Sequence, residues 1–108
     1  MAQTSPKRVS HEDPIRVDAR HYKVELEDDR VRVLRCNYGP GERSTMHGHP
    51  ESIAICLTDA RFRFTYPDGR TEEHQVHRGE VMRLPAGEHL PENLTQNQFE
   101  VLVIELKN

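Results

Sequence analysis

Two histidines separated by a single residue, His47 and His49, are the side chains whose types and spacing most directly point to chemistry. In a β-strand, residues two apart point to the same side, so both imidazoles can face one ion. Neutral imidazole is a common ligand of zinc, iron, nickel and copper. Two ligands are too few for a tight site, and His89, which also follows a glycine-containing turn, is the candidate for the third. Taken alone, the pair is also compatible with ordinary polar residues of a turn.

The elements that must position these histidines are predicted to be strands, because hydrophobic residues recur with a period of two. Phe62, Phe64 and Tyr66 share one face of a predicted hairpin over 60–76, which turns at Gly69. Turn signals about every ten residues favour a β-sandwich or barrel, and we expect no amphipathic helix. Alternation or short apolar runs predict further strands within 21–29, 29–38, 51–57, 79–87 and 99–106.

Some burial patterns are also expected from the sequence. Tyr22, Val24 and Leu26 should share one side of the first strand, and the apolar run within 51–57 suits a strand that is buried on both faces. Four of the seven histidines have no expected role in a site. They are His11, His21, His74 and His77.

Composition limits the classes of function. The chain has 108 residues, enough for one domain with a modest core, and 31% of them are charged, with a net charge of −3. It has no basic stripe, no membrane-spanning apolar stretch and no secretory signal, so we expect a cytoplasmic protein that binds neither nucleic acid nor membranes. Cys36 and Cys56 are expected to be buried, reduced thiols. We expect a flexible tail over residues 1–13 and a single domain over 14–108.

Two stretches resemble the two sequence motifs of the cupin family. In the first motif, glycine is followed by five residues and His-x-His, as Gly41 is here by His47-Gly48-His49. In the second, glycine is followed by five residues and Pro-x-Gly, then two residues, histidine, three residues and asparagine. Here Gly79 precedes Pro85-Ala86-Gly87 by that spacing, one residue instead of two leads to His89, and Asn93 ends the motif. The resemblance runs from about residue 20 to the C-terminus and implies an all-β double-stranded β-helix, the cupin jelly-roll barrel, in a single domain.

The chain departs from the first motif at the metal-binding glutamate. That position falls on Ile53 or Ala54, neither of which can bind a metal, although Glu51 lies nearby as a candidate substitute. The resemblance therefore implies that His47, His49 and His89 bind one divalent ion of iron, manganese, nickel or zinc, with the remaining positions open. Arg83 either points inward, where it would bind a substrate carboxylate, or outward into solvent. The residues expected near the pocket are Tyr38, Met46, Glu51, Ile53, Phe64, Met82 and Arg83.

The resemblance implies a metal-binding cupin that acts on a small organic molecule. Cupins with three histidines and no carboxylate include iron dioxygenases that act on diketones and thiols, so dioxygenase-like chemistry is the leading interpretation. The alternative is a non-catalytic module that binds a small molecule, with a structural metal or none. No catalytic residue can be assigned from the sequence. Because cupin-like barrels commonly form dimers, a homodimer is also expected.

Overall fold

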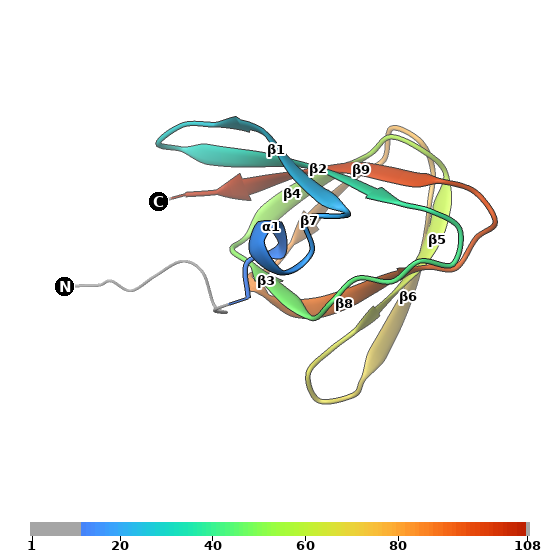
Figure 1. Ribbon diagram of the computed structural model, residues 1–108. Helices are drawn as coiled ribbons and strands as arrows, with labels where there is room; N and C mark the ends of the chain where they lie inside the picture. Colours follow the sequence, from blue (N-terminus) through green and yellow to red (C-terminus); the bar gives the residue numbers. More distant parts are fainter. Residues whose placement is uncertain (1–11, 108) are drawn as a thin grey trace.

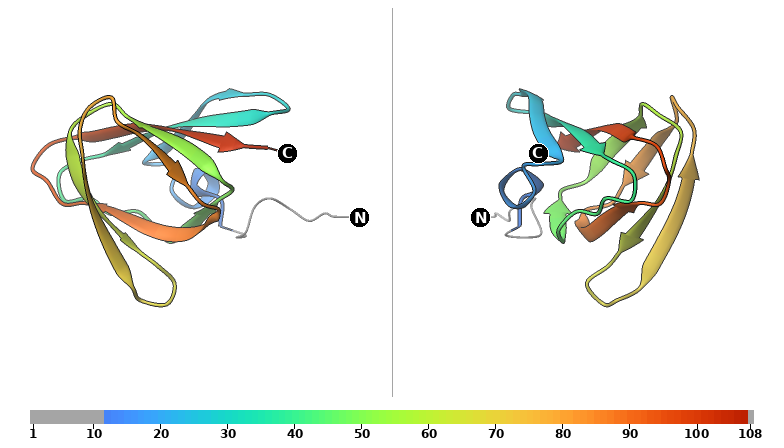
Figure 2. Two further views of the ribbon diagram at one scale, coloured as in Figure 1. Left: turned by 180° about the vertical axis from the view of Figure 1, so that it is seen from behind. Right: turned by 45° about the vertical axis from the view of Figure 1, so that its right-hand side comes forward.

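The computed structural model describes residues 12–107 and folds them into two antiparallel β-sheets that face one another (Figures 1 and 2). One sheet has the order β1-β2-β9-β4-β7 and the other the order β3-β8-β5-β6. The all-β prediction is confirmed. The strands are β1 (Tyr22–Glu27), β2 (Val31–Tyr38), β3 (His47–His49), β4 (Ser52–Cys56), β5 (Ala60–Thr65), β6 (Thr71–Val76), β7 (Val81–Leu84), β8 (Gly87–Asn93) and β9 (Phe99–Leu106).

The core lies between the two sheets and follows the predicted alternation. Along β2 and β9, alternate side chains are buried, and on β5 Phe62 and Phe64 meet them from the other sheet. Cys36 and Cys56 are buried free thiols. Asn93 ends β8 and fixes the loop that follows, because its amide donates to the carbonyls of Tyr38, Gly39 and Asn97.

Two burial expectations were wrong. In β1 only Tyr22 is buried, because the register shifts between Val24 and Leu26 and the strand lies at the edge of its sheet. In β4 the side chains alternate between buried and half-buried, so Ile53 and Ile55 lie on the outer face instead of being enclosed on both sides. A continuous apolar run therefore marks here a strand with one buried face and one half-buried face.

A short helix precedes the barrel and was not predicted. Helix α1 (Pro14–Val17) begins with Asp13 as its N-cap, whose carboxylate accepts a hydrogen bond from the Ile15 amide, and Pro14 occupies the first turn. Both features are typical helix starts, but four residues are too few for a hydrophobic period. We placed Glu12 and Asp13 in a flexible tail, whereas the structure holds both by contacts with the barrel. The rest of that tail, including His11, lies outside the described residues.

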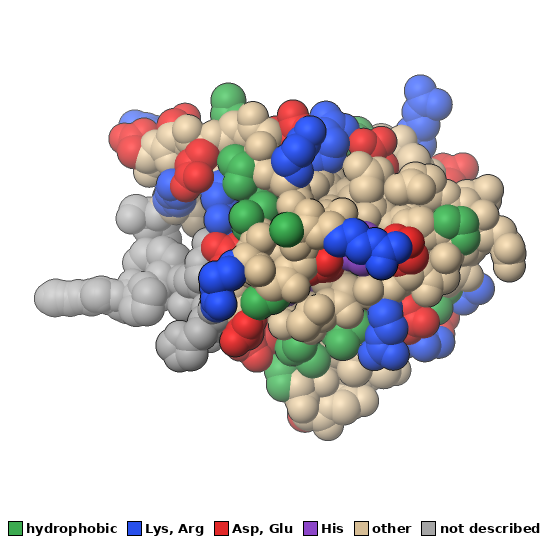
Figure 3. All heavy atoms as spheres, viewed as in Figure 1, with side chains coloured by type: hydrophobic (Ala, Val, Ile, Leu, Met, Phe, Trp, Pro, Cys, Tyr) green, Lys and Arg blue, Asp and Glu red, His purple; other side chains and the backbone are tan. Residues whose placement is uncertain are grey.

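The charged surface is mixed in sign. On the face seen in Figure 3, lysine and arginine side chains alternate with aspartate and glutamate. Within residues 12–107, no helix is both long and apolar enough to cross a bilayer.

Candidate metal centre

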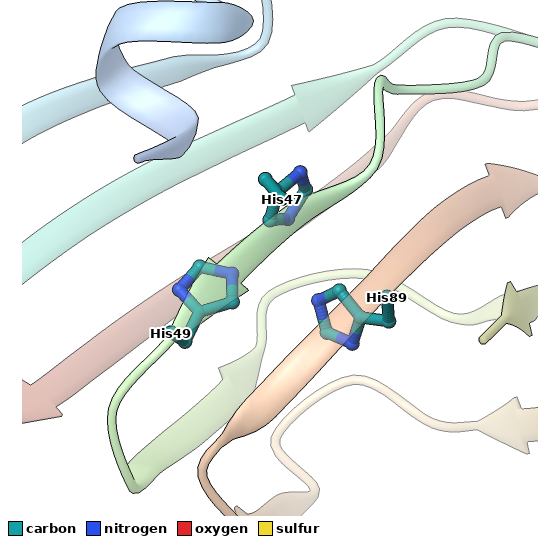
Figure 4. A group of neighbouring side chains, drawn as sticks. All are labelled: His47, His49 and His89. Carbon is teal, nitrogen blue, oxygen red and sulfur yellow. The ribbon is translucent and has the colours of Figure 1, made fainter. Parts of the chain in front are cut away.

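Strands β3 and β8 bring the three predicted histidines together. They pair in antiparallel fashion with His47 opposite His89, while His49 follows two residues later on the same side of β3. Figure 4 shows the three rings converging in front of the two strands. One nitrogen from each ring can be chosen so that all three lie within 4.8 Å of one another. The geometry therefore places three candidate ligand atoms around a common point.

His49 is oriented by a buried carboxylate. Its Nδ1 lies 2.6 Å from Oε2 of Glu105, which is 1% exposed, and since a carboxylate can only accept, Nδ1 carries the proton. Nε2 is then the nitrogen available to an ion. The other oxygen of Glu105 accepts a 2.9 Å hydrogen bond from Nε of Arg32. This carboxylate–histidine pair is the arrangement that orients metal-binding histidines in other proteins.

His47 is held in the same tautomer by a carbonyl. Its Nδ1 donates to the Thr45 carbonyl oxygen at 2.8 Å, and the Ser44 hydroxyl is also near, at 3.2 Å. Its Nε2 lies 3.2 Å from the hydroxyl of Tyr22, which is itself 2.6 Å from the hydroxyl of Tyr38. Both imidazoles of β3 therefore direct Nε2 toward the shared point, and each ring is oriented by the hydrogen bond at its Nδ1.

The environment keeps two of the three rings neutral. Burial, and next the proximity of His49, lower the pKa of His47 to about 3. Burial also holds the pKa of His89 well below its usual value, with the neighbouring His49 and His47 acting in the same direction. A neutral imidazole is the form that binds metal. His47 and His89 can therefore bind a cation without first losing protons at neutral pH.

Two of the three histidines, His49 and His89, line an apolar cavity of about 40 Å³. His89 stacks on Phe64 with ring centroids 4.2 Å apart, and both line this cavity together with His49. A larger depression shares these three residues and continues along β7 and β8 toward Arg70 and Glu72. The metal-facing side of the cluster thus adjoins space for a ligand whose body is largely apolar.

The predicted pocket residues fall into two groups. Tyr38, Phe64 and Met82 line the cavity, whereas Ile53 points to the outer face of β4, because Ser52 and Ala54 occupy the inner one. Met46 is half-buried just before β3.

Glu51 does not join the histidines. Its carboxylate pairs at the surface with the Arg83 guanidinium, 2.6 Å away, and both side chains are more than half exposed. Arg83 lies opposite Ile53 on the outward side of β7 and reaches only the outer part of the larger depression. Among the described residues, the group able to hold a metal consists of the three histidines alone.

Sequence reasoning missed the polar residues behind the ligands. Arg32 and Glu105 are buried on the inner faces of β2 and β9, and their parity with Leu34 and Val103 could have revealed them. His21, for which we expected no role, is buried between the carboxylates of Asp18 and Glu42. No periodic signal marks that histidine, because it precedes the first strand.

The fold of the chain is similar to that of solved cupin structures. A cupin domain from Bordetella pertussis Tohama I matches with a TM-score of 0.75 and 22% identity, over 99% of this chain and 100% of that one. A cupin superfamily protein from Desulfitobacterium hafniense DCB-2 matches with a TM-score of 0.60 and 17% identity, over 81% of this chain and 76% of that one. A structure of oxalate oxidase matches with a TM-score of 0.57 and 19% identity, over 71% of this chain and 42% of that one. No protein-family model and no curated protein matches the sequence.

These likenesses concern the fold, since all three identities are below 25%. They agree with the two facing sheets and with the resemblance of the histidine motifs described above. The chain is therefore a small single-domain barrel with the cupin fold over nearly its whole length.

Proposed function

We propose that the protein binds one divalent metal ion, with iron the leading candidate, and uses it in oxidative chemistry on a small organic molecule. The observation that carries this proposal is the convergence of His47, His49 and His89 beside an apolar cavity that His49 and His89 line. Three nitrogen ligands on one side of an ion leave its other positions open, which a catalytic metal requires. Manganese, nickel and zinc suit the same donors, so the donor set fits the group without selecting one metal.

A bound iron ion would supply Lewis acidity and redox chemistry with dioxygen. The chain's own residues would do the rest. Phe64, Met82 and Leu84 would enclose the apolar body of the ligand. Burial raises the pKa of Tyr22 and of Tyr38, so both phenols stay protonated and can donate hydrogen bonds beside the ligand set. The cavity of about 40 Å³ holds only a few water-sized groups, which favours a compact molecule.

A second candidate is a non-catalytic binding module. Two observations favour it: the described metal cluster contains no carboxylate, and the Glu105 carboxylate is already engaged by His49 and Arg32. A ligand in the apolar cavity would then be recognised without turnover, and the metal would be structural or absent.

The two candidates differ in metal content and in oxygen use. Protein purified without added metal is analysed for its elements, and oxygen consumption is followed after addition of a β-diketone or a small thiol. The proposal expects stoichiometric iron and substrate-dependent oxygen uptake that is lost in His89→Ala and kept in His77→Ala, which changes an exposed histidine. Bound metal without oxygen uptake would favour the binding module. Absence of metal, even after incubation with Fe²⁺, would reject the metal centre.

A further inference from the structure

Residues 12–18, which we call the N-terminal strap, are connected to the histidine-bearing strand β3 in three ways. One is a direct hydrogen bond, and the other two run through intervening side chains. We propose that the strap holds His47 and His49 in ligand geometry and thereby sets the metal affinity of the centre. The inference rests on the proposed metal binding and concerns the support of the site, not its ligands. The strap comprises Glu12, Asp13, helix α1 and Asp18, and α1 lies against β1 and β3.

The first contact is made by the backbone. Strand β3 has three residues, lies at the edge of its sheet and pairs there with β8. The amide of Gly48, between the two histidines, donates a 3.0 Å hydrogen bond to the carbonyl oxygen of Glu12. So short an edge strand is weakly fixed by its own ladder. The strap therefore adds a hydrogen bond between the two ligands, on a strand that otherwise relies on β8.

The second contact reaches His49 through charges. Both oxygens of Asp13 accept hydrogen bonds from Arg32, at 2.9 and 3.0 Å, and Arg32 donates in turn to Glu105. Glu105 accepts the Nδ1 proton of His49. Arg32 is thus shared between two carboxylates. Without the Asp13 charge, the guanidinium would turn toward Glu105 and compete with His49 for that carboxylate.

The third contact reaches His47 through a hydroxyl. Ser44 Oγ donates to the carboxylate of Asp18 at 2.5 Å and lies 3.2 Å from Nδ1 of His47. The hydroxyl of Ser44 has one proton, which it shares with Asp18 in this hydrogen bond. The lone pairs of its oxygen therefore face the Nδ1–H of His47. Asp18 is buried and is also contacted by His21. Both β3 histidines are therefore fixed from behind by the strap, whereas His89 stacks on Phe64.

The experiment is a Co²⁺ titration of the full chain, followed by visible absorption at a temperature well below every variant's unfolding midpoint. The variants are Asp13→Asn, which keeps an oxygen for capping, Ser44→Ala and Glu105→Gln. The control is Glu73→Gln, which removes an exposed carboxylate on β6, at the opposite edge of the sheet from β3, that pairs with Arg61 and Arg63. Outer-shell partners of metal ligands typically change affinity about 10–100-fold. We expect such a loss, with an altered Co²⁺ band, in Asp13→Asn, Ser44→Ala and Glu105→Gln, and no change in the control.

A double variant separates positioning from general destabilisation. If Asp13 acts through Glu105, then Asp13→Asn combined with Glu105→Gln should bind Co²⁺ no more weakly than Glu105→Gln alone. Independent losses that multiply would overturn that route. If the wild type binds Co²⁺, His89→Ala does not, and Asp13→Asn binds like the wild type, the inference fails while the metal centre stands. If the wild type does not bind Co²⁺, the metal centre itself fails. Should Glu105→Gln fail to fold, Asp13→Asn, which changes a residue of the strap itself, still decides the question.

Discussion

At the scale of single residues, the clustering of the three histidines could be predicted, whereas the polar residues behind them were missed. His47 and His49 could be predicted because residues two apart in a strand point to the same side. His89 could be predicted because a second cupin-like motif follows about one strand pair later in the sequence. Arg32 and Glu105 stand within apolar stretches, where a charged residue is usually assigned to the solvent side. Their parity with Leu34 and Val103 places both on the inner faces, and the pairing of β2 with β9, which sets Arg32 opposite Glu105, shows that the two charges satisfy each other there.

Buried neutral histidines predict how stability depends on pH. The folded state holds the pKa of His47 near 3, whereas the unfolded chain has the ordinary value near 6.5. Below pH 6.5 the unfolded state therefore binds more protons, and the free energy of unfolding falls as the pH drops from 6.5 toward 3. The expected slope is about 1.4 kcal/mol per pH unit for each such histidine, and His89 shifts in the same direction.

Urea unfolding of metal-free protein at pH 7.5, 6 and 5 measures this slope. The free energy of unfolding of His47→Gln should fall less steeply on acidification than that of the wild type. The difference in slope should correspond to at most one proton taken up on unfolding. His77→Gln, an exposed histidine after β6, serves as the control and should keep the wild-type slope. Equal slopes for the two variants would show that His47 is not buried in its neutral form.

At the scale of elements, length decided what could be predicted. Strands β2, β5 and β9 have six or more residues each and show their alternation in the sequence. Helix α1 has four residues and β3 has three, so neither contains a full pattern. The register shift in β1 is likewise invisible, because it depends on pairing with β2. Strand β3, which carries two of the three candidate ligands, is thus among the elements that periodicity detects least well.

The start of the described chain should contribute to stability. Deleting residues 1–13 removes the N-cap of α1 and leaves Arg32, largely buried, without one of its two carboxylate partners. Loss of a cap alone costs about 1 kcal/mol, and the loss of two hydrogen bonds from the Arg32 guanidinium adds to it. We expect a clear drop in the melting temperature, contrary to what a flexible tail through residue 13 would give. Deletion of residues 1–11, which keeps both contacts, is the control, and equal midpoints for the two truncations would contradict the account.

At the scale of the whole molecule, the strand order was beyond local reasoning. The order β1-β2-β9-β4-β7 places strands from opposite ends of the chain side by side, and no period in the sequence specifies that. The resemblance of two short motifs to those of cupins supplied the architecture. The same topology explains the site, because it brings β3 and β8 into register across the 37 residues, 50–86, that lie between them.

The outer face of the larger sheet supports the expectation of a homodimer. Leu26, Val33, Ile104 and Ile53 are successive partners across β1, β2, β9 and β4, and they form an apolar row on that face. Leu26 is 56% exposed. Two salt bridges lie beside the row, one between Arg35 and Glu25 and the other between Arg83 and Glu51. A two-fold copy could therefore meet apolar residues with apolar residues and each charge with its opposite.

Light scattering after size exclusion tests this assembly. We expect a dimer for the wild type and a folded monomer for Ile104→Lys, which places a charge in the middle of the row. Val24→Lys is the control, because Val24 pairs with the inward-facing Leu34 and lies outside the row. A wild-type monomer at all concentrations, or an Ile104→Lys dimer, would contradict the assignment of this face.

The central claim is that one ion is bound by three histidines that only the fold brings together. Calorimetric titration with Fe²⁺ under anaerobic conditions tests it on the wild type, His47→Ala, His49→Ala, His89→Ala and His77→Ala. We predict one ion per chain for the wild type and for His77→Ala. Each of the other three should lose more than about 100-fold in affinity, beyond the effect of an outer-shell partner, because no carboxylate in the described cluster can replace a lost ligand. Equal affinities across all five proteins would contradict the claim.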